Sequence, residues 1–331
     1  MNIRTLAKKI GMSHMTVSRA LNGSPNVAPA TRERVLSLAR ELGYELHGPA
    51  RGLATGKTAT IGILYPFHEL RAIESWYTMQ LMHDIRVALD HEKFDSIIAG
   101  YDTDTNGVQD IGRLISQRKV DAVVVIGYEV PRAALETLSE RSARYLCVNP
   151  PLESWVSKHP RVVIDQELGG ELAGRALKDN GCTHVAAMNE DAPQFLDRLV
   201  GFRRVWESYS SVNLADGRYE TAYRTTQEHL HSLIGAVDGL FVGSDVSALG
   251  ALNALQDAGV RVPDQVAVVG YDDIDSALYS RPALSTIHQP RVRVAECVAN
   301  WVRSASAGTP ETDAYMVELL SPWYVQRGTC S

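Results

Sequence analysis

The pattern of apolar and polar residues at the start of the chain predicts a short helix followed by a tight turn. Leu6, Ala7 and Ile10 lie on one face of this helix, and the side-chain oxygen of Asn2 can cap its start. Gly11 follows, and glycine readily adopts the left-handed conformation that a helix end needs. The spacing therefore predicts a first helix that ends before Gly11.

A second short helix is predicted after Ser13, which is a good N-cap residue. Its buried face should carry Val17 and Leu21. Its opposite face carries polar residues and one methionine: His14, Met15, Ser18 and Arg19. Two such helices with glycine at the joint are typical of a helix-turn-helix, which presents its second helix to the DNA major groove. A plain helical hairpin is the alternative.

A third helix should run from about 29 to 42, because a proline stands in its first turn. Val35, Leu38 and Leu42 would close a small core over the first two helices. Ala28 occupies the position of the capping residue and has no side chain that can accept a hydrogen bond. We therefore expect this helix to start without a side-chain cap.

From Thr60 onwards, apolar runs alternate with helical stretches. The predicted strands are Thr60–Tyr65, Ser96–Gly100, Ala122–Ile126, Tyr145–Val148, Val162–Ile164, His184–Met188, Gly239–Val242 and Val266–Val269. The predicted helices are Trp76–Asp90, Val108–Gln117, Pro131–Glu140, Glu167–Asp179, Phe195–Tyr209, Tyr223–Ile234, Ser244–Ala258 and Arg291–Ala305. This alternation indicates parallel sheets covered by helices, and it occurs twice. We predict two similar α/β subdomains with a ligand cleft beyond the carboxyl ends of their strands.

Charge is divided unequally along the chain. Residues 1–57 hold nine Lys or Arg and three Glu, a net charge of +6, whereas the whole chain has −6. Residues 58–331 therefore carry −12. A basic segment on an acidic body is typical of a nucleic-acid-binding module joined to another domain.

Composition limits the remaining possibilities. A chain of 331 residues with 45% hydrophobic residues is long enough for two or three globular domains. No apolar run approaches the roughly 20 residues of a membrane span, and the N-terminus has no signal-peptide pattern. We therefore expect a cytoplasmic protein without membrane contact. The four cysteines are far apart and have no metal or redox spacing, so we expect buried thiols and no metal site.

Several motifs together resemble the lactose-repressor/galactose-repressor (LacI/GalR) family of bacterial transcription regulators. They are MTVSRALNG, VAPATRERVLSLARELGY and ARGL near the N-terminus, then KVDAVVVIG, SDVSALGALNAL, VPDQVAVVGYDD and PALSTIHQP. They occur in the order found in the family and extend over essentially the whole chain.

The resemblance implies a helix-turn-helix headpiece at 1–46 and a hinge at 47–57. It also implies a bilobed core at 58–331 that is similar to periplasmic sugar-binding proteins. Lobe one would comprise 58–160 and 290–316, and lobe two 161–289 and 317–331, with three crossovers. In the family the hinge folds into a helix when two subunits lie side by side on DNA. Leu53 matches the leucine that enters the minor groove there, although it could be an ordinary linker residue.

The family's base-reading positions correspond to His14, Met15 and Arg19. Arginine can make two hydrogen bonds to guanine, so Arg19 is the strongest candidate. Met15 offers apolar contact to a thymine methyl group, or simple packing. Five further residues match positions suited to phosphate contacts: Ser13, Thr16, Asn22, Thr31 and Arg34.

The family's ligand positions also have counterparts in this chain. Asp272 ends a predicted strand, and a carboxylate accepts hydrogen bonds from ligand hydroxyls or ring nitrogens; a turn-capping role is the alternative. Arg198 could bind a carboxylate or two hydroxyls. The remaining matches are Trp76, Tyr77, Asn149, Ser244 and Gln289, with Tyr128 and Gln194 as weaker candidates.

The resemblance implies a ligand-controlled regulator that binds a pseudo-palindromic operator as a homodimer. We predict a repressor of sugar or sugar-acid utilisation genes, with a purine- or nucleoside-responsive regulator as the alternative. A different class, a sugar-binding receptor or an enzyme with a DNA-binding arm, is the main competitor. We predict no enzyme activity and no cofactor, because the sequence has no Gly-x-Ser-x-Gly elbow, metal cluster or complete P-loop.

Overall fold

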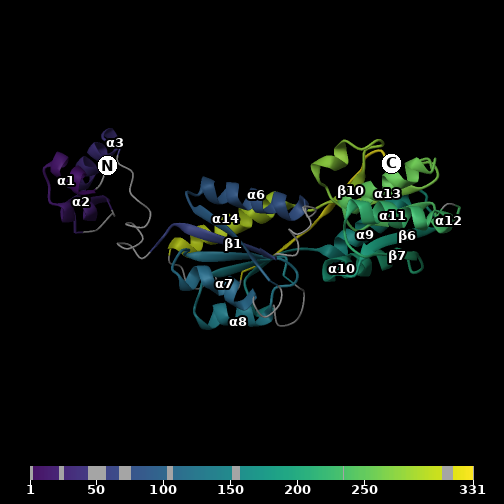
Figure 1. Ribbon diagram of the computed structural model, residues 1–331, viewed down its shortest axis with the longest axis horizontal. Coiled ribbons are helices and arrows are strands. Elements are labelled where there is room, and N and C mark those ends of the chain that lie inside the picture. The colour runs from purple at the N-terminus through teal and green to yellow at the C-terminus, as the bar shows by residue number, and fades with distance from the viewer. Residues whose placement is uncertain are drawn as a thin grey trace.

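The chain forms a small helical body followed by two α/β lobes (Figure 1). The computed structural model describes residues 3–21, 26–43, 57–66, 76–102, 107–150, 157–233, 235–307 and 316–330. Within these ranges, no helix combines the length and hydrophobicity that crossing a bilayer requires.

Three helices form the N-terminal headpiece: α1 (Ile3–Ile10), α2 (His14–Leu21) and α3 (Pro29–Glu41). They enclose a core in which Leu6, Val17 and Val35 are fully buried. The core differs in part from the prediction, because Leu42 is exposed after the end of α3 and Ala39 is buried instead. A helix end cannot turn every apolar residue inward, since only one face meets the core.

The helix starts in the headpiece agree with the sequence. The Ser13 hydroxyl accepts a hydrogen bond from the Thr16 backbone N–H at 3.0 Å, so Ser13 caps α2. Ala28 precedes α3 and makes no side-chain cap, as predicted. The proposed cap Asn2 lies outside the described residues.

Lobe one is built on a six-stranded sheet with the order β11-β5-β4-β3-β1-β2, all parallel. Its strands are β1 (Thr60–Pro66), β2 (Asp95–Tyr101), β3 (Ala122–Ile126), β4 (Tyr145–Val148), β5 (Arg161–Ile164) and β11 (Val317–Leu320). One face packs against α6 (Trp76–His91) and α14 (Arg291–Ala307). The other packs against α7 (Gly107–Ser116) and α8 (Arg132–Glu140).

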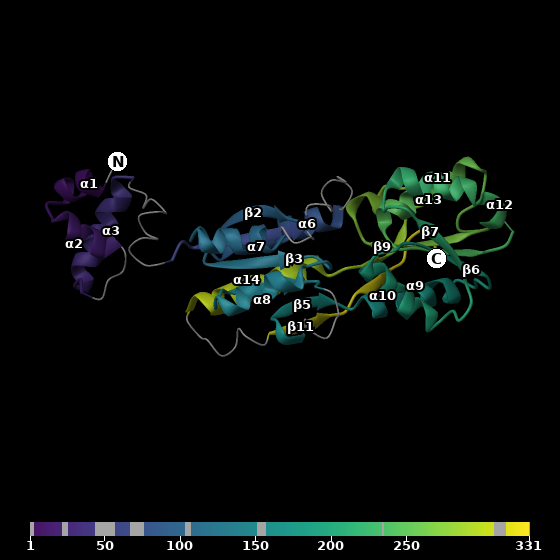
Figure 2. The same cartoon turned by 60° about the horizontal axis from the view of Figure 1, so that its bottom comes forward.

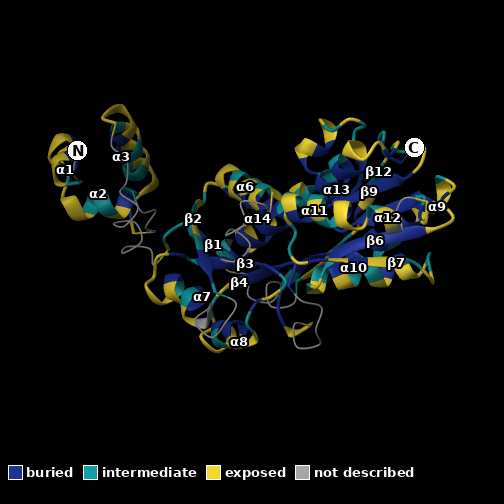
Figure 3. Cartoon of the chain, turned by 45° about the vertical axis from the view of Figure 1, so that its right-hand side comes forward, coloured by how far each residue is buried: buried dark blue, intermediate teal, exposed yellow. Residues whose placement is uncertain are grey.

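Lobe two repeats this architecture with the strand order β12-β10-β9-β8-β6-β7, in which only the β10–β12 pair is antiparallel. Its strands are β6 (Val185–Glu190), β7 (Ser210–Leu214), β8 (Gly239–Val242), β9 (Ala267–Asp272), β10 (Ser285–His288) and β12 (Trp323–Val325). Its helices are α9 (Gln166–Asp179), α10 (Pro193–Arg203), α11 (Tyr219–Glu228), α12 (Leu230–Leu233), α13 (Asp245–Asp257) and the 3₁₀ turn η2 (Asp275–Leu278). Buried strands lie between exposed helix faces in both lobes (Figure 3).

The predicted fold class, a headpiece plus two parallel-sheet subdomains, is confirmed. The lobe boundaries at 160/161 and 316/317 need correction, because β5 and β11 pair with each other in the first sheet. The chain therefore passes between the lobes after β5, after β10 and after β11 (Figure 2). Sequence periodicity identifies a strand but does not say which sheet it joins.

Candidate functional site

A cavity of about 430 Å³ lies between the two lobes. This interlobe cavity is lined by residues that follow or end strands of both sheets, such as Tyr128 after β3, Asn149 after β4 and Asp272 at the end of β9. Ligands of α/β sheets bind at this edge, and the volume is within the roughly 300–1,000 Å³ of small-molecule sites.

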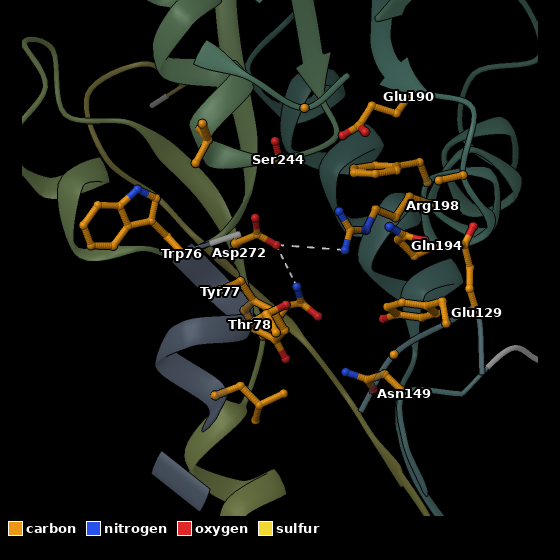
Figure 4. A pocket seen from close by; sticks show the side chains of 18 of the residues that line it. Trp76, Tyr77, Thr78, Glu129, Asn149, Glu190, Gln194, Arg198, Ser244 and Asp272 are labelled. Carbon is orange, nitrogen blue, oxygen red and sulfur yellow. Dashed lines mark hydrogen bonds and ion pairs between the residues drawn. The ribbon is translucent and has the colours of Figure 1, made fainter. Parts of the chain in front are cut away.

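The structure brings together all the residues that the sequence suggested for the effector. The cavity lining includes Trp76, Tyr77, Asn149, Arg198, Ser244, Asp272 and Gln289, and also the weaker candidates Tyr128 and Gln194. Figure 4 shows how side chains from α6, α10 and the strand ends converge on the cavity. Whether each of them contacts a ligand remains a prediction.

Arg198 is held by an unusually close pair of helices. A methyl group at Gly170 of α9 would collide with the backbone carbonyl of Arg198, and one at Gly201 of α10 would collide with the backbone carbonyl of Glu167. Glycine at both positions lets the two helix backbones approach. The approach places the Arg198 guanidinium, which is 4% exposed, 3.7 Å from the centre of the Tyr271 ring.

Protein groups occupy part of the Arg198 guanidinium. Its Nε donates to Gln166 Oε1 at 2.8 Å, and its Nη1 donates to the backbone carbonyl of Gly243. Its Nη2 lies 3.9 Å from Asp272 Oδ1, the ion pair drawn as a dashed line in Figure 4. Arginine has five N–H donors, so Nη2 and the second N–H of Nη1 can still donate to a ligand.

Asp272 ends β9 in a strained backbone conformation, with φ of 120°. Burial raises the pKa of its carboxyl to about 6, although the neighbouring Arg198 charge and the hydrogen bond from Gln289 lower it. The deeper Asp245 is fully buried and accepts from Thr286 Oγ1 at 2.6 Å. Burial, and then the charge of Asp272, raise the pKa of Asp245 well above its usual range. Sequence reasoning did not identify Asp245.

A second carboxyl group on the cavity, Glu190 at the end of β6, was also missed. Burial raises its pKa to about 7, opposed by the charge of Arg198. Glu190 ends its strand as Asp272 does. The rule that ligands of α/β sheets bind at the carboxyl ends of the strands could have identified it. Nearby, Asp216 and Arg218 line the cavity and lie 3.7 Å apart.

Aromatic rings form the apolar part of the cavity. Trp76 is 52% exposed and Phe195 is buried, and both line the cavity. The Tyr128 hydroxyl is buried and has no hydrogen-bond partner within the described ranges. Aromatic faces next to convergent polar groups suit a ligand that has both an apolar face and hydroxyl groups.

The headpiece presents its predicted base-reading residues to solvent. His14 and Arg19 are exposed on α2, and Met15 is 59% exposed. Exposure of Met15 argues against the alternative that it only packs in the core. The phosphate-contact candidates Ser13 and Arg34 are exposed, whereas Thr16 and Thr31 are partly buried. The candidates Asn22 and Leu53 lie outside the described residues.

Comparison with known proteins assigns both parts of the chain. Residues 2–45 match the model of bacterial regulatory proteins of the lacI family, and residues 175–330 match a periplasmic binding protein-like domain. A transcriptional repressor, PurR of Vibrio parahaemolyticus serotype O3:K6, is 29% identical over 307 residues, which are 88% of each chain. The chain belongs to the LacI family.

Solved structures agree with this assignment. The transcriptional regulator CelR in complex with cellobiose has a TM-score of 0.71 and 26% identity, over 99% of each chain. The lac repressor dimer bound to operator and an anti-inducer has the same fold, with a TM-score of 0.82 at 20% identity over 99% of this chain and 98% of that one. The relatives of this LacI-family chain are transcriptional regulators and not enzymes.

The four cysteines are free and buried. In the described part of the chain, no group of three or more His, Cys, Asp or Glu residues could hold a metal ion.

Proposed function

We propose that this LacI-family regulator represses its target genes as a homodimer on a pseudo-palindromic operator, under the control of a small molecule in the interlobe cavity. A two-fold dimer matches a two-fold operator, because each headpiece meets one half-site. The basic headpiece and the solvent-facing His14, Met15 and Arg19 of α2 support the DNA-binding part. Such a regulator would act in the cytoplasm, where the DNA is.

The interlobe cavity favours an uncharged sugar over a sugar acid. Its aromatic walls can stack on a sugar ring, and the carboxyls of Asp272 and Glu190 can accept hydrogen bonds from hydroxyls. Four carboxyl groups but only two arginines line the cavity, which disfavours a ligand carboxylate, and this single observation carries the choice. The cellobiose complex of CelR supports a sugar ligand as well.

Allosteric control follows from the position of the cavity. A ligand that binds one interlobe angle more tightly than another shifts the dimer towards that state. We propose that this shift reaches DNA through the segment at 47–57, in which Leu53 would enter the minor groove. The change in the free energy of operator binding equals the difference between the ligand's binding free energies to the DNA-bound and the DNA-free protein.

A gel-shift titration with the DNA upstream of the gene tests the proposal. The full-length protein should shift this DNA specifically, and an uncharged sugar should change the affinity. Cellobiose, gluconate and hypoxanthine would represent a neutral sugar, a sugar acid and a purine. Failure to bind specifically with or without these compounds would favour a receptor with a non-specific DNA-binding arm.

A thermal-shift screen complements the titration. An effector at about 100 times its dissociation constant should stabilise the protein by roughly 2.7 kcal/mol. Stabilisation by gluconate without any by neutral sugars would refute the argument from the carboxyl groups of the cavity, and stabilisation by hypoxanthine would support the purine-responsive alternative.

A further inference from the structure

Four side chains form a closed ring next to the interlobe cavity. Arg198 Nε donates to Gln166 Oε1 at 2.8 Å, and Gln166 Nε2 donates to Gln289 Oε1 at 3.2 Å. Gln289 Nε2 then donates to Asp272 Oδ1 at 2.7 Å. The ion pair between Asp272 and Arg198, at 3.9 Å, closes the ring.

The ring is directional, and its direction is forced by chemistry. Arginine can only donate, so Gln166 must turn its oxygen towards Arg198 and its amide nitrogen towards Gln289. An ionised carboxylate can only accept, so Gln289 must turn its amide nitrogen towards Asp272. Each glutamine is therefore fixed in one orientation, and a change at any member must be accommodated by its neighbours.

The ring also spans the joints between the lobes. Gln166 lies two residues after β5, at the first crossover, and Gln289 follows β10, at the second. Asp272 and Arg198 both line the cavity and belong to lobe two. Gln166 is 1% exposed and is absent from the cavity lining, so its influence on a ligand would be indirect.

We propose that Gln166 is a positioning residue that couples the cavity to the angle between the lobes. It holds the Arg198 guanidinium and, through Gln289, the Asp272 carboxylate, and it stands on one of the segments that join the lobes. The inference rests on the proposed function only in taking the cavity as the effector site. A movement of the crossovers changes how Arg198 and Asp272 are presented, and occupancy of the cavity acts on the crossovers in return.

The first test measures the interlobe distance in the full-length protein without ligand. Spin labels on cysteines introduced at Glu140 of α8 and Lys178 of α9, both exposed, would report one lobe each. The native cysteines are buried and should react slowly. Gln166→Leu keeps the size of the side chain and removes its hydrogen bonds to Arg198, Gln289 and the Ile164 carbonyl, so the distance distribution should broaden and its mean should shift.

The control is Gln227→Leu on α11, an exposed glutamine whose amide donates to the Tyr223 hydroxyl at 3.1 Å. This variant should leave the distance distribution unchanged. A Gln166→Leu distribution that matches both the parent and the control would overturn the proposal.

A mutant cycle provides the second test. If the ring acts as a unit, Gln166→Leu and Gln289→Leu together should lower the melting temperature by no more than the larger single loss. Gln166→Leu and Gln227→Leu should instead be additive. If the losses of melting temperature at Gln166 and Gln289 are additive, the ring does not act as a unit and the proposal is contradicted. Neither test uses operator or effector, so this inference and the proposed function can fail separately.

Discussion

The carboxyl of Glu190 gives the most direct quantitative prediction. Burial at the end of β6 raises its pKa from an ordinary 4.5 to about 7, so the folded protein keeps a proton that the unfolded chain releases. Glu190→Gln removes the titrating charge and preserves the size of the side chain. The variant therefore isolates the cost of the charge in the cavity wall.

The magnitude follows from the pKa change. One pKa unit corresponds to about 1.4 kcal/mol, so the rise from 4.5 to about 7 has an upper limit of roughly 3.5 kcal/mol. Glu190 is only partly buried, and solvent screening reduces the expected value to about 1–2 kcal/mol.

The direction of the pKa shift sets the pH range in which the Glu190 charge destabilises the fold. The cost is absent below the unfolded pKa of 4.5, grows as pH rises towards 7, and is complete above the folded pKa. We therefore expect Glu190→Gln to be more stable than the parent at about pH 8 and nearly equal to it at about pH 4.5.

Urea denaturation at the two pH values measures this difference. Glu207→Gln serves as the control, because Glu207 is exposed and its replacement changes the net charge by the same amount. A stability gain of equal size at both pH values would refute the reasoning, as would a variant that is less stable than the parent at the higher pH.

Three further predictions concern the headpiece and the packing of α9 on α10. Arg19→Ala should weaken specific operator binding by about 1–3 kcal/mol and relax the preference at one base pair; an equal loss on every sequence in a gel-shift titration would make Arg19 a phosphate contact. Met15→Ala should lower operator affinity and change the unfolding free energy by less than about 0.5 kcal/mol, since the side chain is 59% exposed. Gly201→Ala should destabilise the fold by at least about 1–3 kcal/mol in urea denaturation, because the added methyl group would collide with the Glu167 carbonyl. Gly112→Ala in α7, where the nearest atom is 3.6 Å from the added carbon, should cost nothing and could stabilise by up to about 1 kcal/mol. Equal losses for the two glycines would contradict the close-packing argument.

The comparison of predicted and observed elements shows where local patterns suffice. The strands β3, β4 and β8 have the predicted bounds, and the helix predicted from Ser244 begins at Asp245, because Ser244 caps it by accepting a hydrogen bond from the Ser247 backbone N–H. These elements were predictable because an apolar run or a cap lies within a few residues. Four strands were missed: β7, β10 and β11 contain polar residues, and β12 has only three residues.

Residues of the candidate site were predicted where they belong to a motif and were missed where they do not. Asp272 and Arg198 occur in stretches that resemble the family, and the structure places both at the cavity. Glu190 lies at a strand end without a motif. Gln166 has no distinguishing pattern, and its partner Gln289 lies 123 residues away.

Local sequence patterns were enough to predict the basic headpiece, the repeated alternation of strands and helices, and the residues that follow the strands, because each depends on residues close together in the chain. Long-range contacts were needed to show that β5 and β11 belong to the first sheet, that Arg198 donates to Gln166 and Gly243, and that burial moves the pKa of Glu190 to about 7. Strand pairing, hydrogen-bond satisfaction and desolvation depend on groups distant in the chain, which no local pattern records.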